Sequence, residues 1–142
     1  MFVSDGFAGQ VHVQNLCPSE FGGKLIAFYA EGCNALPCTF VRGRSYNAEL
    51  IFEPGRNSTT LSIRCGAVVL GEPQIIADWS ACEDLTKENR CPVKAGETYK
   101  YAKLVEISPF APPGMYTVHC ELVDDKKTQQ LCVQGDVRLL PW

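Results

Sequence analysis

Residues 115–123 read Met-Tyr-Thr-Val-His-Cys-Glu-Leu-Val, so apolar and polar side chains alternate along this stretch. Its apolar face consists of Tyr116, Val118, Cys120 and Leu122. A period of two is typical of a β-strand with one face buried. The stretch 129–140 shows the same alternation, with an apolar face formed by Leu131, Val133, Val137 and Leu139. Both stretches are therefore predicted to be half-buried strands.

Working outward from these two stretches, most of the chain has the composition and turn signals of short strands. The predicted strands are 10–16, 24–31, 45–53, 59–70, 97–107, 115–123 and 129–140, with turn residues such as Gly22-Gly23 and Pro54-Gly55 between them. Helical periodicity occurs only briefly, around 79–90. Short, evenly spaced strands predict an all-β fold, a sandwich of two antiparallel sheets. The length of 142 residues predicts a single domain over residues 1–142.

The chain contains eight cysteines, and this density indicates an oxidising compartment where disulfides persist. It has no C-x-x-C pair, and its histidines are His12 and His119, so zinc binding and thiol catalysis are disfavoured. Cys33 and Cys38 bracket one short connection and Cys82 and Cys91 another, which suits local bridges. Cys17 and Cys132 can then join the two ends of the chain. Spacing alone does not decide among the 105 pairings that eight cysteines allow.

Charge and motifs exclude several other functions. A net charge of −3 and a pI near 5.4 disfavour nucleic acid and anionic membranes as electrostatic partners. The first residues lack the features of a signal peptide, so a secreted protein would be a mature form. Asn57-Ser58-Thr59 is an N-glycosylation acceptor. No catalytic constellation, metal site or cofactor motif is recognised. Asp124-Asp125 is interpreted as a turn with a charged tip, and both histidines as solvent-facing. We therefore predict that the protein is not an enzyme.

Three segments together resemble one family. They are 37–46 (Pro-Cys-Thr-Phe-Val-Arg-Gly-Arg-Ser-Tyr), 91–99 (Cys-Pro-Val-Lys-Ala-Gly-Glu-Thr-Tyr) and 121–126 (Glu-Leu-Val-Asp-Asp-Lys), followed by Cys132. From about Val11 to Leu139 the chain is similar to the ML, or lipid-recognition, domains, and best to their Niemann–Pick type C protein two branch. The resemblance implies an immunoglobulin-like β-sandwich with a hydrophobic ligand cavity between its sheets. It also implies the bridges Cys17–Cys132, Cys33–Cys38 and Cys82–Cys91.

Cys65 and Cys120 depart from the three-bridge pattern of that branch. Each lies on the apolar face of its predicted strand, so both are expected to point inward. They form either a fourth bridge or two small buried thiols. A bridge here would narrow or divide the interior.

Small residues at inward positions, namely Ala48, Ala67 and Gly135, indicate space between the sheets. The alternative is that they accommodate large neighbours such as Trp79 in a filled core. The resemblance favours the cavity, with its rim formed by the loops 71–77 and 107–114. The predicted cavity and mouth residues are Ala48, Leu50, Phe52, Ile63, Ala67, Val69, Ile75, Ile76, Tyr99, Tyr101, Val105, Ile107, Phe110, Tyr116, Val118, Leu122 and Val133.

These observations support three hypotheses. The first is a secreted or lysosomal carrier of a sterol, fatty acid or other lipid, with a membrane or receptor as the partner for ligand hand-over. The second is an innate-immune lipid co-receptor or a carrier of hydrophobic semiochemicals. The rim segments 72–77 and 107–114 contain no Lys or Arg, which favours a less acidic ligand than a co-receptor binds. The third is a structural, disulfide-rich domain with a filled core.

Overall fold

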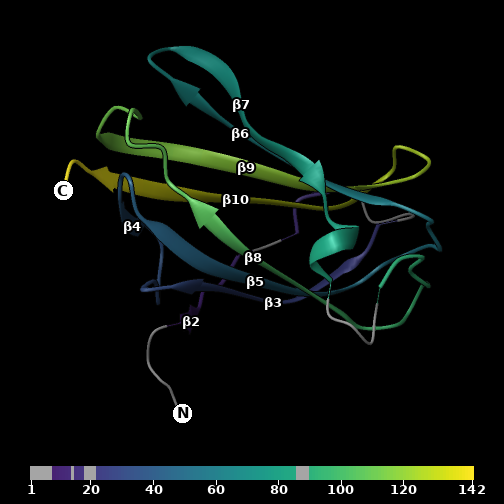
Figure 1. Ribbon diagram of the computed structural model, residues 1–142. Helices are drawn as coiled ribbons and strands as arrows, with labels where there is room; N and C mark the ends of the chain where they lie inside the picture. The colour runs from purple at the N-terminus through teal and green to yellow at the C-terminus, as the bar shows by residue number, and fades with distance from the viewer. Residues whose placement is uncertain (1–7, 14, 18–21, 86–89) are drawn as a thin grey trace.

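The computed structural model describes residues 8–13, 15–17, 22–85 and 90–142 as two stacked β-sheets (Figure 1). The elements are β2 (Ala8–Gln10), β3 (Lys24–Glu31), β4 (Cys38–Val41), β5 (Ser45–Glu53), β6 (Leu61–Val69), β7 (Glu72–Ser80), the 3-10 turn η1 (Cys82–Asp84), β8 (Tyr99–Glu106), β9 (Gly114–Asp124) and β10 (Gln129–Leu140). Over these described ranges, no helix is long and apolar enough to cross a bilayer.

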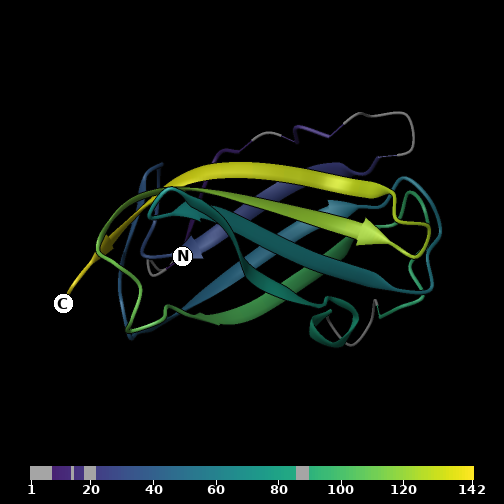
Figure 2. The same ribbon diagram turned by 90° about the horizontal axis from the view of Figure 1, so that it is seen from above.

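The larger sheet has the strand order β4-β10-β9-β6-β7, and the smaller has the order β2-β3-β5-β8. Figure 2 looks onto the larger sheet, with the smaller sheet behind it. The predicted all-β sandwich is therefore confirmed. One pair differs from the predicted antiparallel pattern, because β4 runs parallel to the end of β10. A parallel pair needs a long crossover, and residues 42–128 supply it.

Three predicted strands, 24–31, 45–53 and 129–140, have the predicted limits, and those at 59–70, 97–107 and 115–123 shift by one or two residues. The predicted strand 10–16 is wrong, because β2 ends at Gln10 and the described residues after it are not in a strand. Residue 14 lies outside the described part. Within 79–90, residues 79 and 80 belong to β7 and residues 82–84 form the 3-10 turn η1, while 86–89 lie outside the described residues.

Strand β7 is the main feature that the sequence interpretation missed, because residues 71–77 were expected to form a loop. Leu70 and Gly71 both have positive φ angles, 53° and 83°, between strands that pair Val69 with Glu72. A two-residue connection with both φ values positive is the turn that suits a hairpin. Pro73 is tolerated because β7 is an edge strand, where a missing N–H leaves no ladder bond unmade.

The buried core is concentrated at one end of the sandwich. Phe52, the last inward residue of β5, is fully buried there. The rest of this cluster consists of Leu61, Ile63, Ala81, Leu85, Val93, Tyr99, Tyr101, Leu122 and Leu131. A smaller cluster of Val11, Ala30, Cys33 and Cys38 lies along β3 and β4, with Phe28 and Phe40 packed against it. We call the end around Phe52 the packed end, and the opposite end the open end.

Asp124 corrects another expectation, because it is buried and is not a charged turn tip. Its carboxylate accepts hydrogen bonds from the backbone N–H groups of Lys126 and Thr128 and from the Gln130 amide. Arg56 lies 3.7 Å away across the packed end. A buried carboxylate is tolerated when it is paired and hydrogen-bonded in this way. Asp124 therefore anchors the β9–β10 turn, and only Asp125 of the pair is exposed.

Candidate functional site

The two ends of the sandwich differ in how completely their inward side chains are covered. At the packed end, Leu61 and Leu122 are almost inaccessible to solvent. Leu50 on β5 packs against the core cluster of the packed end. Toward the open end, several inward positions are only half-buried, and these are Ala48 on β5, Val69 on β6, Val105 on β8, and Tyr116 and Val118 on β9. Solvent therefore reaches apolar side chains that face the other sheet. An apolar, partly covered interior of this kind suits a hydrophobic ligand.

The predicted site residues divide between these two ends. Phe52, Ile63, Tyr99, Tyr101 and Leu122 lie in the packed core and fill it. Six others lie toward the open end, namely Ala48, Ala67, Val69, Val105, Tyr116 and Val118, and Ala67 is the most buried of them at 6% exposure. Val133 is half-buried beside Cys120, its register partner. The predicted site residues are therefore divided between a close-packed core and a set of less covered positions.

A β-bulge changes which way the β7 side chains point. Cys65 pairs with Ala77, but the next residue, Gly66, pairs with Ile75, so Ile76 is the extra residue. Trp79 stays on the inward face opposite Ile63. Ile75 is 64% exposed and lies over the outer face of the larger sheet. Ile76, the bulge residue, is 52% exposed.

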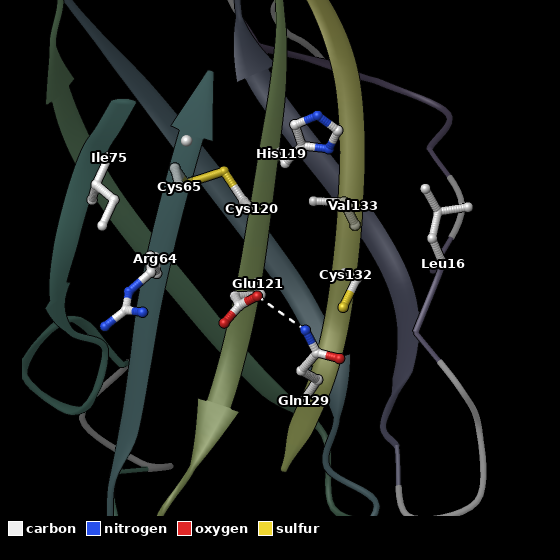
Figure 3. Close-up of a pocket in the computed structure, with 11 residues that line it drawn as sticks. Leu16, Arg64, Cys65, Ile75, His119, Cys120, Glu121, Gln129, Cys132 and Val133 are labelled. Atoms are coloured by element: carbon white, nitrogen blue, oxygen red, sulfur yellow. Dashed lines mark hydrogen bonds between the residues drawn. A yellow bond between two sulfur atoms is a disulfide. The ribbon is translucent and has the colours of Figure 1, made fainter. Parts of the chain in front are cut away.

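The outer face of the larger sheet bears a shallow hollow of about 330 Å³ (Figure 3). Its lining residues are Leu16, Arg64, Cys65, Gly66, Ile75, His119, Cys120, Glu121, Gln129, Cys132 and Val133. Gln129 donates a hydrogen bond to Glu121 at 3.0 Å. Arg64, which lines this hollow, pairs with Asp78 at 3.3 Å. His119 faces solvent here, as expected.

Exposed apolar side chains surround the open end. Phe110 and Leu70 are 89% and 84% exposed. Phe110 lies in the 107–114 loop and Leu70 at the tip of the β6–β7 hairpin, and both segments are at the left of Figure 1. Ile107, in the 107–114 loop, is half-buried, and Ile76, on β7, is 52% exposed. The loop is held by Arg42, whose Nη1 donates to the Ala111 carbonyl at 3.2 Å. Two fixed segments with apolar tips therefore frame the open end.

The edge strands of the two sheets, β7 and β8, are in contact through Trp79. The indole Nε1 of Trp79 donates a hydrogen bond to the hydroxyl of Tyr101. The ammonium of Lys103 lies 4.8 Å from the centroid of the Trp79 ring.

Four disulfides hold these elements. The structure contains Cys17–Cys132, Cys33–Cys38 and Cys82–Cys91, the three bridges that the resemblance implies. Cys65 and Cys120 also form a disulfide, so of the two alternatives the fourth bridge is correct and the buried thiols are not. These two are register partners on β6 and β9, between the pairs Ile63–Leu122 and Ala67–Val118. The fourth bridge therefore marks the boundary between the packed end and the open end.

The acceptor Asn57 is exposed, and its Oδ1 accepts a hydrogen bond from the Ala95 backbone at 2.9 Å. It lies beside the packed end, away from the gap described above. Over the described residues, no cluster of three or more His, Cys, Asp or Glu side chains is placed to hold a metal ion.

Comparison with known proteins identifies the family. A model of the ML domain family matches residues 10–139. NPC intracellular cholesterol transporter 2 of Bos taurus is 28% identical over 104 residues, which cover 72% of this chain and 68% of that protein. The same transporter of Danio rerio is 24% identical over 119 residues, covering 83% and 78%.

Solved structures show the same fold. The Niemann-Pick type C2 protein of the Japanese carpenter ant superposes with a TM-score of 0.78 at 18% identity, covering 91% of this chain and 99% of that chain. Chicken MD-1 complexed with lipid IVa superposes with a TM-score of 0.51 at 13% identity, covering 85% and 100%. With a family model that spans nearly all of its length, this chain belongs to the ML domain family.

Proposed function

We propose that this chain is a carrier that holds one sterol, fatty acid or similar lipid between its sheets and that it has no catalytic activity. The observation behind the proposal is the half-buried, apolar inner surface of the open end, while the larger buried core lies at the other end. The relatives named as cholesterol transporters support the same class of ligand. Four disulfides suit a secreted or lysosomal carrier.

Apolar burial is sufficient to drive such binding. Covering about 500 Å² of ligand surface contributes roughly 12 kcal/mol at about 25 cal/mol per Å². Association and ordering cost several kcal/mol of this, so a dissociation constant in the micromolar to nanomolar range is expected. Exposed Phe110 and Leu70 beside the open end then form the surface that meets a membrane or receptor during hand-over.

A second candidate function is that of a lipid co-receptor or semiochemical carrier with the same fold. The MD-1 likeness, at a TM-score of 0.51, concerns the fold alone. The rim segments 72–77 and 107–114 contain no Lys or Arg, which favours the carrier of a weakly charged lipid over a receptor for a highly phosphorylated one.

The test is whether the protein binds lipid at all. Organic extraction of purified protein, followed by mass spectrometry, should release about one lipid per chain. The extracted protein should then bind a fluorescent sterol or fatty acid saturably, and its melting temperature should rise with ligand concentration. Absence of both extracted lipid and saturable binding would leave the filled-core structural domain as the correct interpretation.

Two neighbouring substitutions locate the binding surface. Val105 faces inward and is half-buried, whereas Leu104, the preceding residue, is 60% exposed on the outer face of β8. Val105→Glu should lower lipid affinity at least tenfold, because a carboxylate would have to be desolvated beside the ligand. Leu104→Glu should change affinity less than twofold. Circular dichroism confirms that both variants are folded. Equal effects at both positions would show that the ligand binds elsewhere.

A further inference from the structure

The N-glycosylation triplet lies in a turn that is bound to a second loop at the packed end. Asn57-Ser58-Thr59 is the only N-x-S/T triplet in the sequence, and it lies between β5 and β6. Ser58, its middle residue, is 3% exposed. The Ser58 N–H donates to the Val93 carbonyl at 3.0 Å, and the Val93 N–H donates to the Ser58 carbonyl at 2.8 Å. The segments 54–60 and 92–98 are therefore held together by paired backbone bonds.

The side chain of Asn57 is exposed and is oriented by one hydrogen bond. Its Oδ1 accepts from the Ala95 N–H at 2.9 Å. Among the residues that the structure describes, none accepts a hydrogen bond from Nδ2 of Asn57. An N-linked oligosaccharide is attached to this nitrogen, and attachment leaves Oδ1 able to accept as before. A glycan on Nδ2 would therefore keep the contact that holds Asn57.

The surface around Asn57 is open to solvent and has room for an oligosaccharide. In the segment 92–98 every residue except Val93 is exposed. None of the exposed large apolar side chains of the described residues lies in 54–60 or 92–98. Both segments are at the right of Figure 1, whereas the 107–114 loop with Phe110 is at the left. A glycan here would cover neither the open end nor its apolar tips.

We infer that Asn57 is N-glycosylated and that the oligosaccharide is attached before the chain folds. This inference goes beyond the proposed carrier function and does not depend on it. The donor class is an oligosaccharide linked to a lipid through a diphosphate. A bond forms between the anomeric carbon and Nδ2 of Asn57, and the bond from that carbon to the diphosphate oxygen breaks. Nδ2 loses one proton, and the lipid diphosphate leaves.

The order of the two events follows from the hydroxyl of the triplet. The transferase reads Thr59 as well as Asn57, because an Asn without a hydroxyl two residues later is not an acceptor. In the folded chain the Thr59 hydroxyl donates to Asp125 at 2.8 Å, and the Thr59 N–H donates to the same carboxylate oxygen at 2.7 Å. With Ser58 also paired, the triplet enters an enzyme cleft only if these bonds break. Folding therefore closes the site, and the glycan has to be attached first.

The first experiment determines whether the glycan is present. The full chain is secreted from a eukaryotic cell line and treated with a peptide N-glycosidase in water enriched in heavy oxygen, which converts a glycosylated Asn to labelled Asp. The label should map to Asn57. Thr59→Ser should retain the glycan, and Thr59→Val should lose it. Absence of label at Asn57 in wild-type protein would overturn the inference.

The same material tests whether the fold accepts the glycan. Folded wild-type protein with the glycan should melt within about 2 °C of bacterially produced, glycan-free protein, because no hydrogen bond of the fold is lost. A larger fall in melting temperature would contradict the orientation of Asn57 on which the inference depends.

The second experiment tests the order of events. Glycan-free protein is offered to purified oligosaccharyltransferase and its lipid-linked donor, once folded with its disulfides and once reduced and unfolded. The unfolded chain should be modified at least about tenfold faster, because the folded triplet has to open first. Asp125→Ala, which frees the Thr59 hydroxyl, should raise the rate of the folded protein toward that of the unfolded chain. Equal rates for folded and unfolded wild-type protein would show that folding does not close the site.

Asn57→Asp is the matched control. It keeps an oxygen for the Ala95 N–H and removes the nitrogen that accepts the oligosaccharide, so it should fold normally and should not be modified in either state. Transfer to this variant would place the modification at another residue and overturn the assignment to Asn57.

Discussion

The indole of Trp79 donates a hydrogen bond to the Tyr101 hydroxyl, and this bond joins the edge strand of one sheet to the edge strand of the other. β7 and β8 are not paired by backbone hydrogen bonds, since each is the last strand of its own sheet. The contact lies beside the packed core, to which Trp79 also packs. It therefore joins the two sheets beside the packed core, along the seam between β7 and β8.

Tyr101→Phe should destabilise the protein by about 1–3 kcal/mol, because the buried indole N–H loses its acceptor. Urea unfolding measures the change, and ligand release should also become faster as the seam loosens. Tyr29→Phe, on β3 and away from the seam, is the control and should cost less. Equal stability of Tyr101→Phe and wild-type protein would mean that the seam is held by packing alone.

Ala67→Trp tests whether the open end contains real space. Ala67 is 6% exposed on the inward face of β6, opposite Val118. An indole there should occupy ligand space and lower lipid affinity sharply, while the melting temperature of ligand-free protein stays level or rises. Overpacking of a filled interior would instead cost roughly 1–3 kcal/mol.

The control is Val68→Trp at the next position, which is 55% exposed on the other face of the strand. It should affect neither lipid affinity nor stability. If Ala67→Trp is stable and binds lipid normally, the pocket does not include the inward face of β6.

The four bridges should contribute very unequally to stability. Cys17 and Cys132 are 115 residues apart, and Cys33 and Cys38 are 5 apart. In the chain-entropy description, removing the first pair by double alanine substitution costs about 5 kcal/mol and removing the second about 2 kcal/mol. Guanidinium unfolding of the two double variants checks this order. A reversed order would show that native packing, and not loop closure, sets the contribution of each bridge.

Asp125 should make folding sensitive to acid. Its carboxylate accepts hydrogen bonds from the backbone N–H of Thr59 at 2.7 Å and from the Thr59 hydroxyl at 2.8 Å. These two hydrogen bonds hold the pKa of Asp125 below its usual 3.8, and the bond from the backbone N–H has the larger effect. The stabilisation is therefore present above pH 3.8 and is lost as the pH falls through the lower folded-state pKa.

Thr59→Val removes the hydroxyl and keeps the backbone N–H. In glycan-free protein, the pKa of Asp125 should rise part of the way toward 3.8, and the midpoint of acid unfolding should move to higher pH. An NMR titration of the Asp125 carboxyl carbon measures the first change directly. A pKa that does not move would assign the whole effect to the backbone bond.

Regular alternation made much of this fold predictable, and interruptions of it caused the errors. Residues 131–139 alternate regularly, and the strand was predicted with the limits 129–140 that β10 has. In β7, Pro73 and the bulge at Ile76 break the period, so a nine-residue strand was interpreted as a loop. Pairing of Cys65 with Cys120 depends on the register of β6 against β9, which spacing along the chain does not contain.

Parts of the candidate site were also accessible from sequence, and parts were not. Alternation placed Ala67 and Val118 inward, where the structure has them. The division into a packed end and an open end depends on how far the two sheets separate, which no local pattern reports. Burial of Asp124 likewise depends on Arg56, which is remote in the chain.

Because the larger buried core lies at one end, most residues that make the molecule fold are separate from those proposed to contact its ligand. A substitution such as Phe52→Ala would open a void among close-packed neighbours and cost several kcal/mol. A change at half-buried Val105 or Ala48 disturbs little packing, so its cost in stability is small. Relatives of this chain can therefore acquire new ligand preferences through single substitutions at the open end, without compensating changes elsewhere and without approaching the threshold at which the fold fails.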